Sequence, residues 1–463
     1  MQITRNSSIL DNLRGALGDD VVLTGEAIPE RNRQDAMMQP ATLPLALVRP
    51  RTTEEVAKVL SLCNAAHQPV TTQGGMTGLA GGAHPGTAEI ALSLERMSGV
   101  EEVDLVSGTL TALSGTTLQT IQNAAASEGF LCGIDLGARG SCTIGGNVAT
   151  NAGGNQVLRY GMTRHNVLGL EVVQADGTVV KNLNKMLKNN AGYDWTQLFI
   201  GSEGTLGVVT RVVLGLHPPA GERQTALCAC NSLDDAMALL RSMERHFGAN
   251  LLVFEGMWRE FIDVAVARLD LAPPFEKPPE ITVLLEVAGD HDSLAEALGE
   301  LHEQEVLSDA ILARSGPDAA RLWGYRESVY DYSRFQTGFA GFDISVPLPR
   351  MAAAAEALRE AAAQHWPGAV SVVFGHIADC NLHIMVGAPD GGRWLRDEDR
   401  ARIDQTVYAI VARHDGSVSA EHGIGTAKKP YLPMSRSAEE LALMRTMKRA
   451  LDPNNILNRG RVL

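Results

Sequence analysis

Two histidines and a glutamate in the second half of the chain have the side chains of an open metal site. His376 and His383 lie in the segment GHIADCNLH, and Glu421 begins the later segment EHGIG. Two imidazoles and one carboxylate form a three-ligand set that keeps a coordination position free for a substrate oxygen. The alternation after Asn381 places His383 and Met385 on one face of a strand, and His376 falls in the preceding turn, so both imidazoles can converge. These residues predict a divalent cation, zinc in particular.

Glycine-rich segments in the first half predict a site for an anion. The 46 glycines cluster in QGGMTGLAGGA and in the stretches 133–161 and 200–209. Backbone N–H groups that lack a neighbouring Cβ can approach a phosphate closely. The windows 56–88 and 136–170 contain no Asp or Glu, although the overall frequency would place about four in each. Neither GxGxxG between a strand and a helix nor GxxxxGK[ST] occurs, so a dinucleotide Rossmann site and a P-loop are not predicted.

The composition is typical of a soluble globular protein without a nucleic-acid partner. The 463 residues are 45% hydrophobic and 20% charged, which is enough for roughly two to four domains. The net charge of −14 argues against nucleic acid or an anionic membrane surface as partner. No apolar run reaches the length of a membrane span, and the first twenty residues lack a signal-peptide pattern. With six scattered cysteines and no CxxC pair, we expect reduced thiols and a cytoplasmic location.

The predicted elements change character near residue 219. In the first half, a capping box at Thr52 and Glu55 predicts the start of an amphipathic helix. Asp176-Gly177 between two alternating runs predicts the turn of a β-hairpin. A pair of prolines then ends the glycine-rich half.

The second half is predicted to hold an antiparallel sheet. From Gln224 the strands and helices follow the order β-α-β-β-α-β of a ferredoxin-like unit. A further strand, a helix and two strands extend the sheet, and a helix is expected near 398–414. A second capping box, at Ser437 and Glu440, predicts the start of the last helix.

Three segments taken in order resemble the flavin domain of the vanillyl-alcohol oxidase/p-cresol methylhydroxylase fold. They are QGGMTGLAGGA, GSCTIGGNVATNAGGNQVLRYG and LFIGSEGTLGVVT. The histidine and glutamate segments resemble the metal motif of its D-2-hydroxy-acid dehydrogenase branch, which usually reads GHxGDGNLH plus SEHGIG. Ala378 and Cys380 stand at the usual glycine positions and leave the ligands unchanged. The resemblance covers nearly the whole chain. The branch includes D-lactate and D-2-hydroxyglutarate dehydrogenases and the FAD subunit of glycolate oxidase.

The resemblance implies an α+β protein with three parts. Residues 1–218 are expected to form an FAD-binding domain of the p-cresol methylhydroxylase type, with a core of about 42–218. Residues 219–415 are expected to form a substrate domain with a ferredoxin-like antiparallel sheet. Residues 416–463 are expected to form a helical C-terminal segment that carries the Glu-His motif and packs back on the FAD domain.

The resemblance also implies FAD, with its pyrophosphate on the 74–82 loop. Met76 replaces the Asn of the usual GGNTGL. His84 lies beyond the usual position of covalent attachment, so non-covalent FAD is predicted. The residues implied to contact the cofactor are Gln73, Gly74, Gly75, Met76, Thr77, Gly78, Leu79, Gly82, Ser141, Thr143, Gly145, Gly146, Asn147, Thr150, Asn151, Gly153, Gly154, Glu203, Gly204, Gly207, Val208 and Asn458.

The reaction implied is oxidation of a D-2-hydroxy acid to the 2-oxo acid. The cation on His376, His383 and Glu421 would bind the hydroxyl and carboxylate oxygens and lower the hydroxyl pKa. His422 would take that proton as general base while the hydride leaves C2 for the flavin N5. Adjacent residues point apart on a strand, but the glycines after His422 predict a loop. Arg326 matches the arginine that binds the substrate carboxylate in the family, and its guanidinium fork suits that role.

The pocket for the substrate's tail departs from that of D-2-hydroxyglutarate dehydrogenases. Three polar side chains of those enzymes correspond here to Tyr330, Gly341 and Met385. A second carboxylate would lose its donors, whereas an apolar tail would gain contact. We therefore expect a D-lactate-like or larger monocarboxylic substrate, with D-2-hydroxyglutarate as the alternative.

Two other functions stay open. Reaction of the flavin with O₂ would make the protein a metal-independent oxidase of alcohols, and association with an iron–sulfur protein would make it a flavin subunit of an electron-transfer complex. The chain has no iron–sulfur cysteine set, so a separate carrier is expected to take the electrons. An electron-transfer flavoprotein, a cytochrome or a quinone could be this electron acceptor. A homodimer stays open as the oligomeric state.

Overall fold

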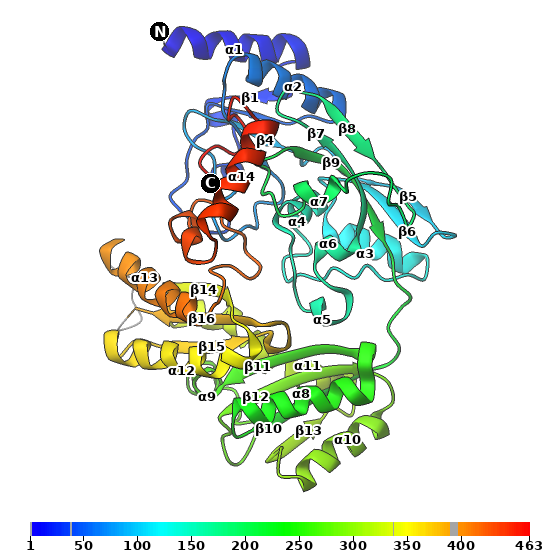
Figure 1. Cartoon of the computed structure of the whole chain (residues 1–463), viewed down its shortest axis with the longest axis vertical. Coiled ribbons are helices and arrows are strands. Elements are labelled where there is room, and N and C mark those ends of the chain that lie inside the picture. The colour runs from blue at the N-terminus through cyan, green and yellow to red at the C-terminus, as the bar shows by residue number, and fades with distance from the viewer. Residues whose placement is uncertain (1, 38, 337, 389–396) are drawn as a thin grey trace. The chain divides into compact units, whose positions relative to one another are not determined.

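The computed structural model of the chain describes residues 2–37, 39–336, 338–388 and 397–463. Its contacts divide the chain into two compact units, both visible in Figure 1. Unit 1 comprises Met1–Gly154, Tyr160–Pro219 and Glu421–Leu463, and unit 2 comprises Asn155–Arg159 and Ala220–Ala420. Both units combine helices with sheets, which confirms the predicted α+β class. The domain boundaries expected at 218 and 415 stay predictions.

The first sheet of unit 1 has the strand order β1-β2-β4-β3, with β2 and β3 parallel to β4. Its strands are β1 (Val22–Leu23), β2 (Ala46–Val48), β3 (Val70–Gln73) and β4 (Ile90–Ser93). Helix α2 (Thr53–Ala65) links β2 to β3, and the hydroxyl of Thr52 accepts a hydrogen bond from the Glu55 N–H as predicted. The buried face of α2 packs on Val70 and Ile90. The glycine-rich loop therefore begins at the carboxyl end of β3, where parallel sheets commonly bind ligands.

The second sheet of unit 1 is antiparallel, in the order β5-β6-β9-β7-β8. The pairing of β7 with β8 confirms the predicted hairpin, and Gly177 in its turn has a φ of 92°. The strands are β5 (Val100–Asp104), β6 (Thr109–Leu113), β7 (Val167–Val173), β8 (Val179–Asn182) and β9 (Val208–Gly215). The other helices of the first 219 residues are α1 (Gln2–Leu17), α3 (Leu118–Ser127), α4 (Ile144–Thr150), α5 (Val157–Tyr160), α6 (Thr163–Asn166) and α7 (Thr196–Phe199).

The C-terminal segment completes unit 1. Helix α14 (Ala438–Leu451) begins with the predicted capping box, in which Ser437 and Glu440 bond reciprocally. Beyond the helix, the Val70 N–H donates to Ile456, and the Asn458 N–H donates to Val70. The tail therefore supplies hydrogen-bond partners to the edge of β3, the strand that leads into the glycine-rich loop.

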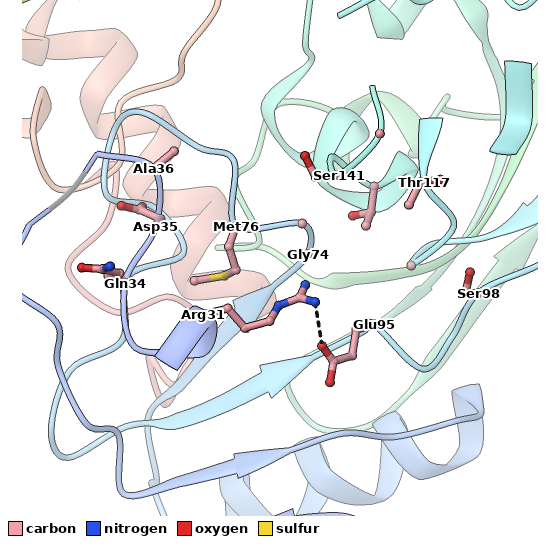
Figure 2. A pocket seen from close by; sticks show the side chains of 14 residues that line it. Arg31, Gln34, Asp35, Ala36, Gly74, Met76, Glu95, Ser98, Thr117 and Ser141 are labelled. Atoms are coloured by element: carbon pink, nitrogen blue, oxygen red, sulfur yellow. Dashed lines mark ion pairs between the residues drawn. The ribbon is translucent and has the colours of Figure 1, made fainter. Parts of the chain in front are cut away.

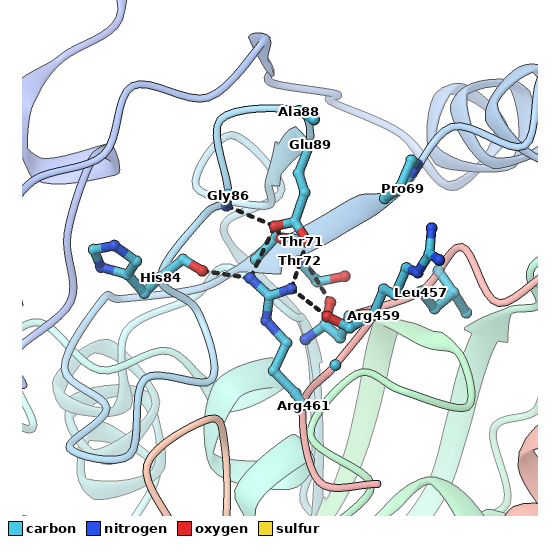
Figure 3. Close-up of polar contacts among 12 residues, drawn as sticks. Pro69, Thr71, Thr72, His84, Gly86, Ala88, Glu89, Leu457, Arg459 and Arg461 are labelled. Atoms are coloured by element: carbon cyan, nitrogen blue, oxygen red, sulfur yellow. Dashed lines mark hydrogen bonds and ion pairs between the residues drawn. The ribbon is translucent and has the colours of Figure 1, made fainter.

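A buried ion pair fastens the end of this tail, as Figure 3 shows. The two terminal nitrogens of Arg461 lie 2.7 and 2.8 Å from the carboxylate oxygens of Glu89, and one of them also donates to the carbonyl of His84. Burial raises the pKa of Glu89, but the bonds from Arg461 outweigh it and hold the pKa below its ordinary value of 4.5. The Arg461 side chain is only 5% exposed.

Replacing Arg461 with alanine is expected to lower the free energy of unfolding by about 3 kcal/mol, because Glu89 is left buried and unpaired. The depressed pKa means that the pair stabilises the fold fully above pH 4.5 and that this contribution is lost as the pH falls through the folded-state value. Urea unfolding at pH 7 and pH 3 measures both effects. Arg459→Ala, at an exposed neighbour, is the control, and equal stability of both variants at pH 7 would contradict this account.

Unit 2 contains one seven-stranded sheet in the order β13-β10-β12-β11-β15-β16-β14. The first four strands have the ferredoxin-like arrangement that the sequence predicts, with one difference: helix α9 (Arg259–Leu269) separates β11 from β12. The strands are β10 (Arg223–Cys230), β11 (Leu251–Trp258), β12 (Ile281–Ala288), β13 (Asp309–Leu312), β14 (Phe339–Ser345), β15 (Ser371–Gly375) and β16 (Asn381–Gly387). The other helices are α8 (Leu233–Phe247), α10 (His291–Glu303), α11 (Gly316–Glu327), α12 (Leu348–His365) and α13 (Asp397–Arg413). No helix in the described ranges is both long and apolar enough to cross a bilayer.

One face of this sheet carries the polar side chains that could bind a ligand or take part in catalysis. Strand register places Met257 opposite Phe374 and Phe374 opposite His383, and Glu255 shares the face of Met257, two residues earlier on β11. Side chains of α9, α11 and the 3₁₀ segment Ser328–Arg334 pack on the same core cluster. Long-range strand pairing therefore assembles one polar group of side chains at the edge of an apolar core.

Candidate functional site

A cavity of about 660 Å³ lies in unit 1 at the end of β3. Its volume is in the usual range for ligand pockets. Figure 2 shows Asp35 and Met76 on one side of it and Thr117 and Ser98 on the other. The lining residues come from five parts of the chain: Arg31, Gln34, Asp35, Ala36, Gly74, Gly75, Met76, Glu95, Ser98, Gly115, Thr117, Gly140, Ser141 and Thr143.

The glycines of the first loop are required by close contact with the second glycine-rich segment. A Cβ on Gly75 would lie 2.1 Å from the carbonyl oxygen of Ser141, and one on Gly74 would lie 2.6 Å from the Thr143 hydroxyl. That hydroxyl and the hydroxyl of Ser114 are buried without a hydrogen-bond partner among the described residues. Close backbone approach and unsatisfied hydroxyls beside a cavity of this size fit a phosphate-containing cofactor such as FAD.

Met76 has a φ of 60°, in the left-handed region. Asn tolerates this conformation better than Met does. Met76 in place of the usual Asn of GGNTGL therefore adds backbone strain at this position and removes an amide side chain.

The N-terminal segment contributes to the cavity, and sequence reasoning missed it. Arg31 lies 3.8 Å from Glu95, and the Asp35 carboxylate accepts a hydrogen bond from the Met37 N–H. The second oxygen of Asp35 has no partner among the described residues, and burial raises the pKa of this carboxyl. No motif marks 31–36, so only the folded arrangement identifies the segment.

Several residues predicted to contact the cofactor hold the fold together in this structure. The amide of Gln73 bonds to Asn32 and to the carbonyl of Ala83. Val208 is 1% exposed and belongs to the same hydrophobic cluster as Val70 and Ile90. A Cβ on Gly207 would collide with Phe199. Both functional atoms of Asn458 are also engaged, because its amide donates to the Glu203 carbonyl and accepts from the Thr72 N–H.

The remaining predicted cofactor residues lie along the three glycine-rich segments. Thr77, Gly78 and Leu79 belong to the loop after β3, with Gly78 and Leu79 exposed. A Cβ on Gly82 would contact the Glu203 carboxylate, and one on Gly204 the Asn458 amide. Helix α4 and the residues that follow it contain Gly145, Gly146, Asn147, Thr150, Asn151, Gly153 and Gly154.

The Glu203 side chain anchors the segment that carries the predicted catalytic histidine. Its carboxylate oxygens accept hydrogen bonds of 2.7 Å from the Ile424 N–H and 2.8 Å from the Gly425 N–H. Burial raises the pKa of Glu203, although these two N–H groups act in the opposite direction. The sequence predicts a cofactor contact for Glu203, whereas its carboxylate fixes the 421–425 loop within unit 1.

Glu421 and His422 begin this loop, and the positive φ of Gly423 and Gly425 agrees with the predicted loop conformation. One carboxylate oxygen of Glu421 accepts a hydrogen bond of 2.7 Å from the Gly154 N–H. The loop thus touches the second glycine-rich segment. Both residues belong to unit 1.

In unit 2 the predicted ligands His376 and His383 lie together. Their ring centroids are 5.6 Å apart at an interplanar angle of 79°, and their side chains are 10% and 13% exposed. His383 also stacks against Phe374 at 5.1 Å, and Asp343 lies 4.0 Å from its Nδ1. Two mostly buried imidazoles with carboxylates behind them have the donor chemistry that a divalent cation such as zinc needs.

Glu255 lies between His376 and Arg326, and sequence reasoning missed it. It accepts hydrogen bonds from His376 Nδ1 and from Arg326 Nε, the latter at 2.7 Å. Burial acts to raise the pKa of Glu255, but the neighbouring His376 and Arg326 lower it well below its ordinary value. Arg326 is itself buried, and its Cζ lies 4.7 Å from the ring centroid of Phe374.

The two departures from the metal motif have different consequences. Cys380 has a φ of 73°, which explains why glycine is usual at that position. Burial raises the pKa of its thiol above the ordinary value of 9.0, which favours the protonated form. Ala378 lies within the 3₁₀ turn Ile377–Asp379.

The three residues predicted to determine which substrate tail is accepted do not lie on the same strand face. Gly341 on β14 pairs directly with Met385 on β16, next to the pair formed by Asp343 and His383. A Cβ on Gly341 would meet no atom within 4 Å, and Met385 packs at the edge of the apolar core. Tyr330 is 72% exposed and does not share this strand face.

Known proteins resemble this chain over nearly its whole length. Residues 44–182 match the family described as "FAD binding domain", and residues 220–462 match "FAD linked oxidases, C-terminal domain". Solved structures share the fold at low identity. p-Cresol methylhydroxylase with substrate bound has a TM-score of 0.76 at 16% identity, covering 99% of this chain and 97% of that one. 4-Ethylphenol oxidase from Gulosibacter chungangensis has a TM-score of 0.74 at 17% identity, with the same coverage.

Curated relatives are more similar in sequence. D-2-Hydroxyglutarate dehydrogenase of Xanthomonas citri pv. viticola is 39% identical, over 90% of this chain and 89% of its own length. The mitochondrial enzyme of that name from Bos taurus is 40% identical, over 90% and 76%. A mitochondrial protein of Schizosaccharomyces pombe with the provisional name D-lactate dehydrogenase is 34% identical, over 89% and 80%. The chain therefore belongs to the FAD-linked oxidase family, together with the D-2-hydroxyglutarate dehydrogenases.

Proposed function

We propose that this protein oxidises a D-2-hydroxy acid to the 2-oxo acid with FAD and a divalent cation, and that His376, His383 and Glu421 bind the cation. The observation that carries the proposal is the pair of mostly buried imidazoles beside a buried arginine on one sheet face. The enzyme is an FAD-dependent hydroxy-acid dehydrogenase, as its family indicates. When bound, FAD accepts the two electrons and the cation polarises the substrate hydroxyl.

Residues of the chain bind and orient the acid. Arg326 is suited to the carboxylate, because its Nε is held by Glu255 and its terminal nitrogens donate no hydrogen bond within the described part of the chain. A guanidinium that presents this edge binds a carboxylate with two parallel hydrogen bonds. The apolar ring of Phe374 beneath it keeps water from one side of the guanidinium.

His422 is proposed to take the hydroxyl proton. A neutral imidazole has a nitrogen lone pair that can accept a proton from a bound hydroxyl, as a general base does. Its loop is held by Glu203, and Glu421 in the same loop is one residue after the end of unit 2.

The substrate's tail is proposed to be apolar. The open space at Gly341 opposite Met385 offers room and a thioether, and neither of these two residues has a side-chain donor for a second carboxylate. D-Lactate or a larger monocarboxylic acid fits this surface. D-2-Hydroxyglutarate is the second candidate, because relatives of 39% and 40% identity carry that name.

The test is dye reduction by the purified FAD-loaded protein with D- and L-lactate and D- and L-2-hydroxyglutarate. We expect activity on D-enantiomers only, with kcat/KM for D-lactate at least about tenfold above that for D-2-hydroxyglutarate. A preference for D-2-hydroxyglutarate would reject the apolar tail and keep the reaction class. Activity on L-enantiomers alone would reject the proposal.

A separate electron carrier is proposed to reoxidise the flavin. Relatives from eukaryotes are named mitochondrial. The cytoplasmic location expected from the sequence stays a prediction.

A further inference from the structure

One buried carboxylate joins the two groups that are proposed to hold the substrate. Glu255 is 1% exposed and lies on β11, which pairs with β15 just before His376. One of its oxygens bonds Nδ1 of His376, and the other accepts from Nε of Arg326 at 2.7 Å. The two partners are 121 and 71 residues away in sequence, so strand pairing and the end of α11 bring them together.

The bond to Glu255 decides which nitrogen of His376 carries the proton in the neutral ring. An ionised carboxylate only accepts hydrogen bonds, so Nδ1 carries a proton. In the neutral ring the lone pair is then on Nε2, which is the form that a metal ion binds. Carboxylates behind metal-binding histidines commonly fix the ring in this way and raise its basicity.

The same carboxylate fixes the direction of Arg326. Its Nε is used by Glu255 and its plane lies over Phe374, so the guanidinium cannot turn freely. The terminal nitrogens then keep one orientation, with no partner within the described residues. A planar carboxylate needs such a fixed fork for two simultaneous hydrogen bonds.

We propose that Glu255 is the positioning residue that prepares both His376 for the cation and Arg326 for the substrate carboxylate. This inference rests on the proposed function. Because one side chain serves both partners, loss of its charge is expected to weaken cation binding and acid binding together. Loss of a purely structural carboxylate would lower stability alone.

The test is Glu255→Gln in the FAD-loaded full-length protein. We expect zinc affinity, measured by competition with a chelator, to fall roughly 10- to 100-fold. We expect KM to rise about tenfold for D-lactate or D-2-hydroxyglutarate, whichever the wild type oxidises faster, because the guanidinium loses its fixed direction. FAD content and flavin absorbance should not change.

Glu286→Gln is the matched control. Glu286 lies on the neighbouring strand β12, is 6% exposed and accepts hydrogen bonds from Thr225 and from Trp323 of α11. It should keep wild-type zinc affinity and KM. Equal effects in both variants, or wild-type zinc affinity in Glu255→Gln, would overturn this inference and leave the proposed function standing. A wild-type protein that binds no zinc would overturn the proposed function and the inference with it.

A second measurement needs no variant. In the zinc-loaded wild type labelled with ¹⁵N-histidine, we expect His376 to keep its proton on Nδ1 and to bind zinc through Nε2. Zinc on Nδ1 would overturn the inference even where Glu255→Gln fails to fold.

Discussion

Replacing His376 with alanine is expected to remove the bound cation and to lower kcat by about a thousandfold, while FAD stays bound. The reason is that the two imidazoles lie 5.6 Å apart between ring centroids and share one site, so the loss of one leaves too few ligands. Steady-state dye reduction and metal analysis of the same preparation measure both effects. The FAD cavity lies in unit 1, so the flavin spectrum should not change.

His365→Ala is the control for this variant. His365 belongs to the same unit but is exposed at the end of α12, where it contacts Trp366. Its replacement should leave metal content and kcat as in the wild type. Full activity of the His376→Ala protein would rule out a catalytic cation at this site.

Replacing Gly75 with alanine is expected to weaken FAD binding roughly a hundredfold, which corresponds to about 3 kcal/mol. The added Cβ would lie 2.1 Å from the Ser141 carbonyl oxygen and 2.8 Å from the Cα of Cys142, and neither backbone atom can move as a side chain would. The two glycine-rich segments would separate, and the cavity between them would lose its shape. Fluorescence titration of the apoprotein with FAD measures the loss.

The control substitution is Gly215→Ala in the same unit. A Cβ at Gly215 would meet Leu168 at an ordinary 3.6 Å. FAD affinity should therefore stay within about twofold of the wild type, because surface changes without a clash cost little. Unchanged FAD affinity in Gly75→Ala would contradict the role assigned to the first glycine-rich loop.

Features that depend on short stretches of sequence are predicted well for this chain. The helix cap at Thr52, the β7–β8 hairpin and the box that begins α14 each need only a few neighbouring residues, and the structure contains all three. The proximity of His376 and His383 is similar, because only six residues and one turn separate them.

Features that depend on distant pairing were not predicted. Glu255 reaches His376 only because β11 pairs with β15, and nothing around it in sequence marks a functional residue. For Asn458 and Gln73, the structure adds contacts that the motifs do not show. Family motifs suggest that they contact the cofactor, but their amides are engaged in joining distant segments of unit 1.

Two departures from the family's motifs lie at positions where the backbone is strained for the residue present. Met76 and Cys380 both adopt positive φ angles, at positions where the usual residues are Asn and Gly. Those residues enter the left-handed region at lower cost. A sequence comparison shows the substitution, and the structure supplies the conformational reason for the usual residue.

Anaerobic single-turnover reduction of the flavin most directly tests the central claim that a cation and FAD act together on a D-2-hydroxy acid. The protein would be loaded with FAD, depleted of metal by a chelator, mixed with D-lactate or D-2-hydroxyglutarate, and titrated with zinc while the flavin absorbance is followed. We predict negligible bleaching without metal and a rate that rises with added zinc up to about one equivalent per chain. Bleaching at the full rate in the metal-free protein would contradict the account.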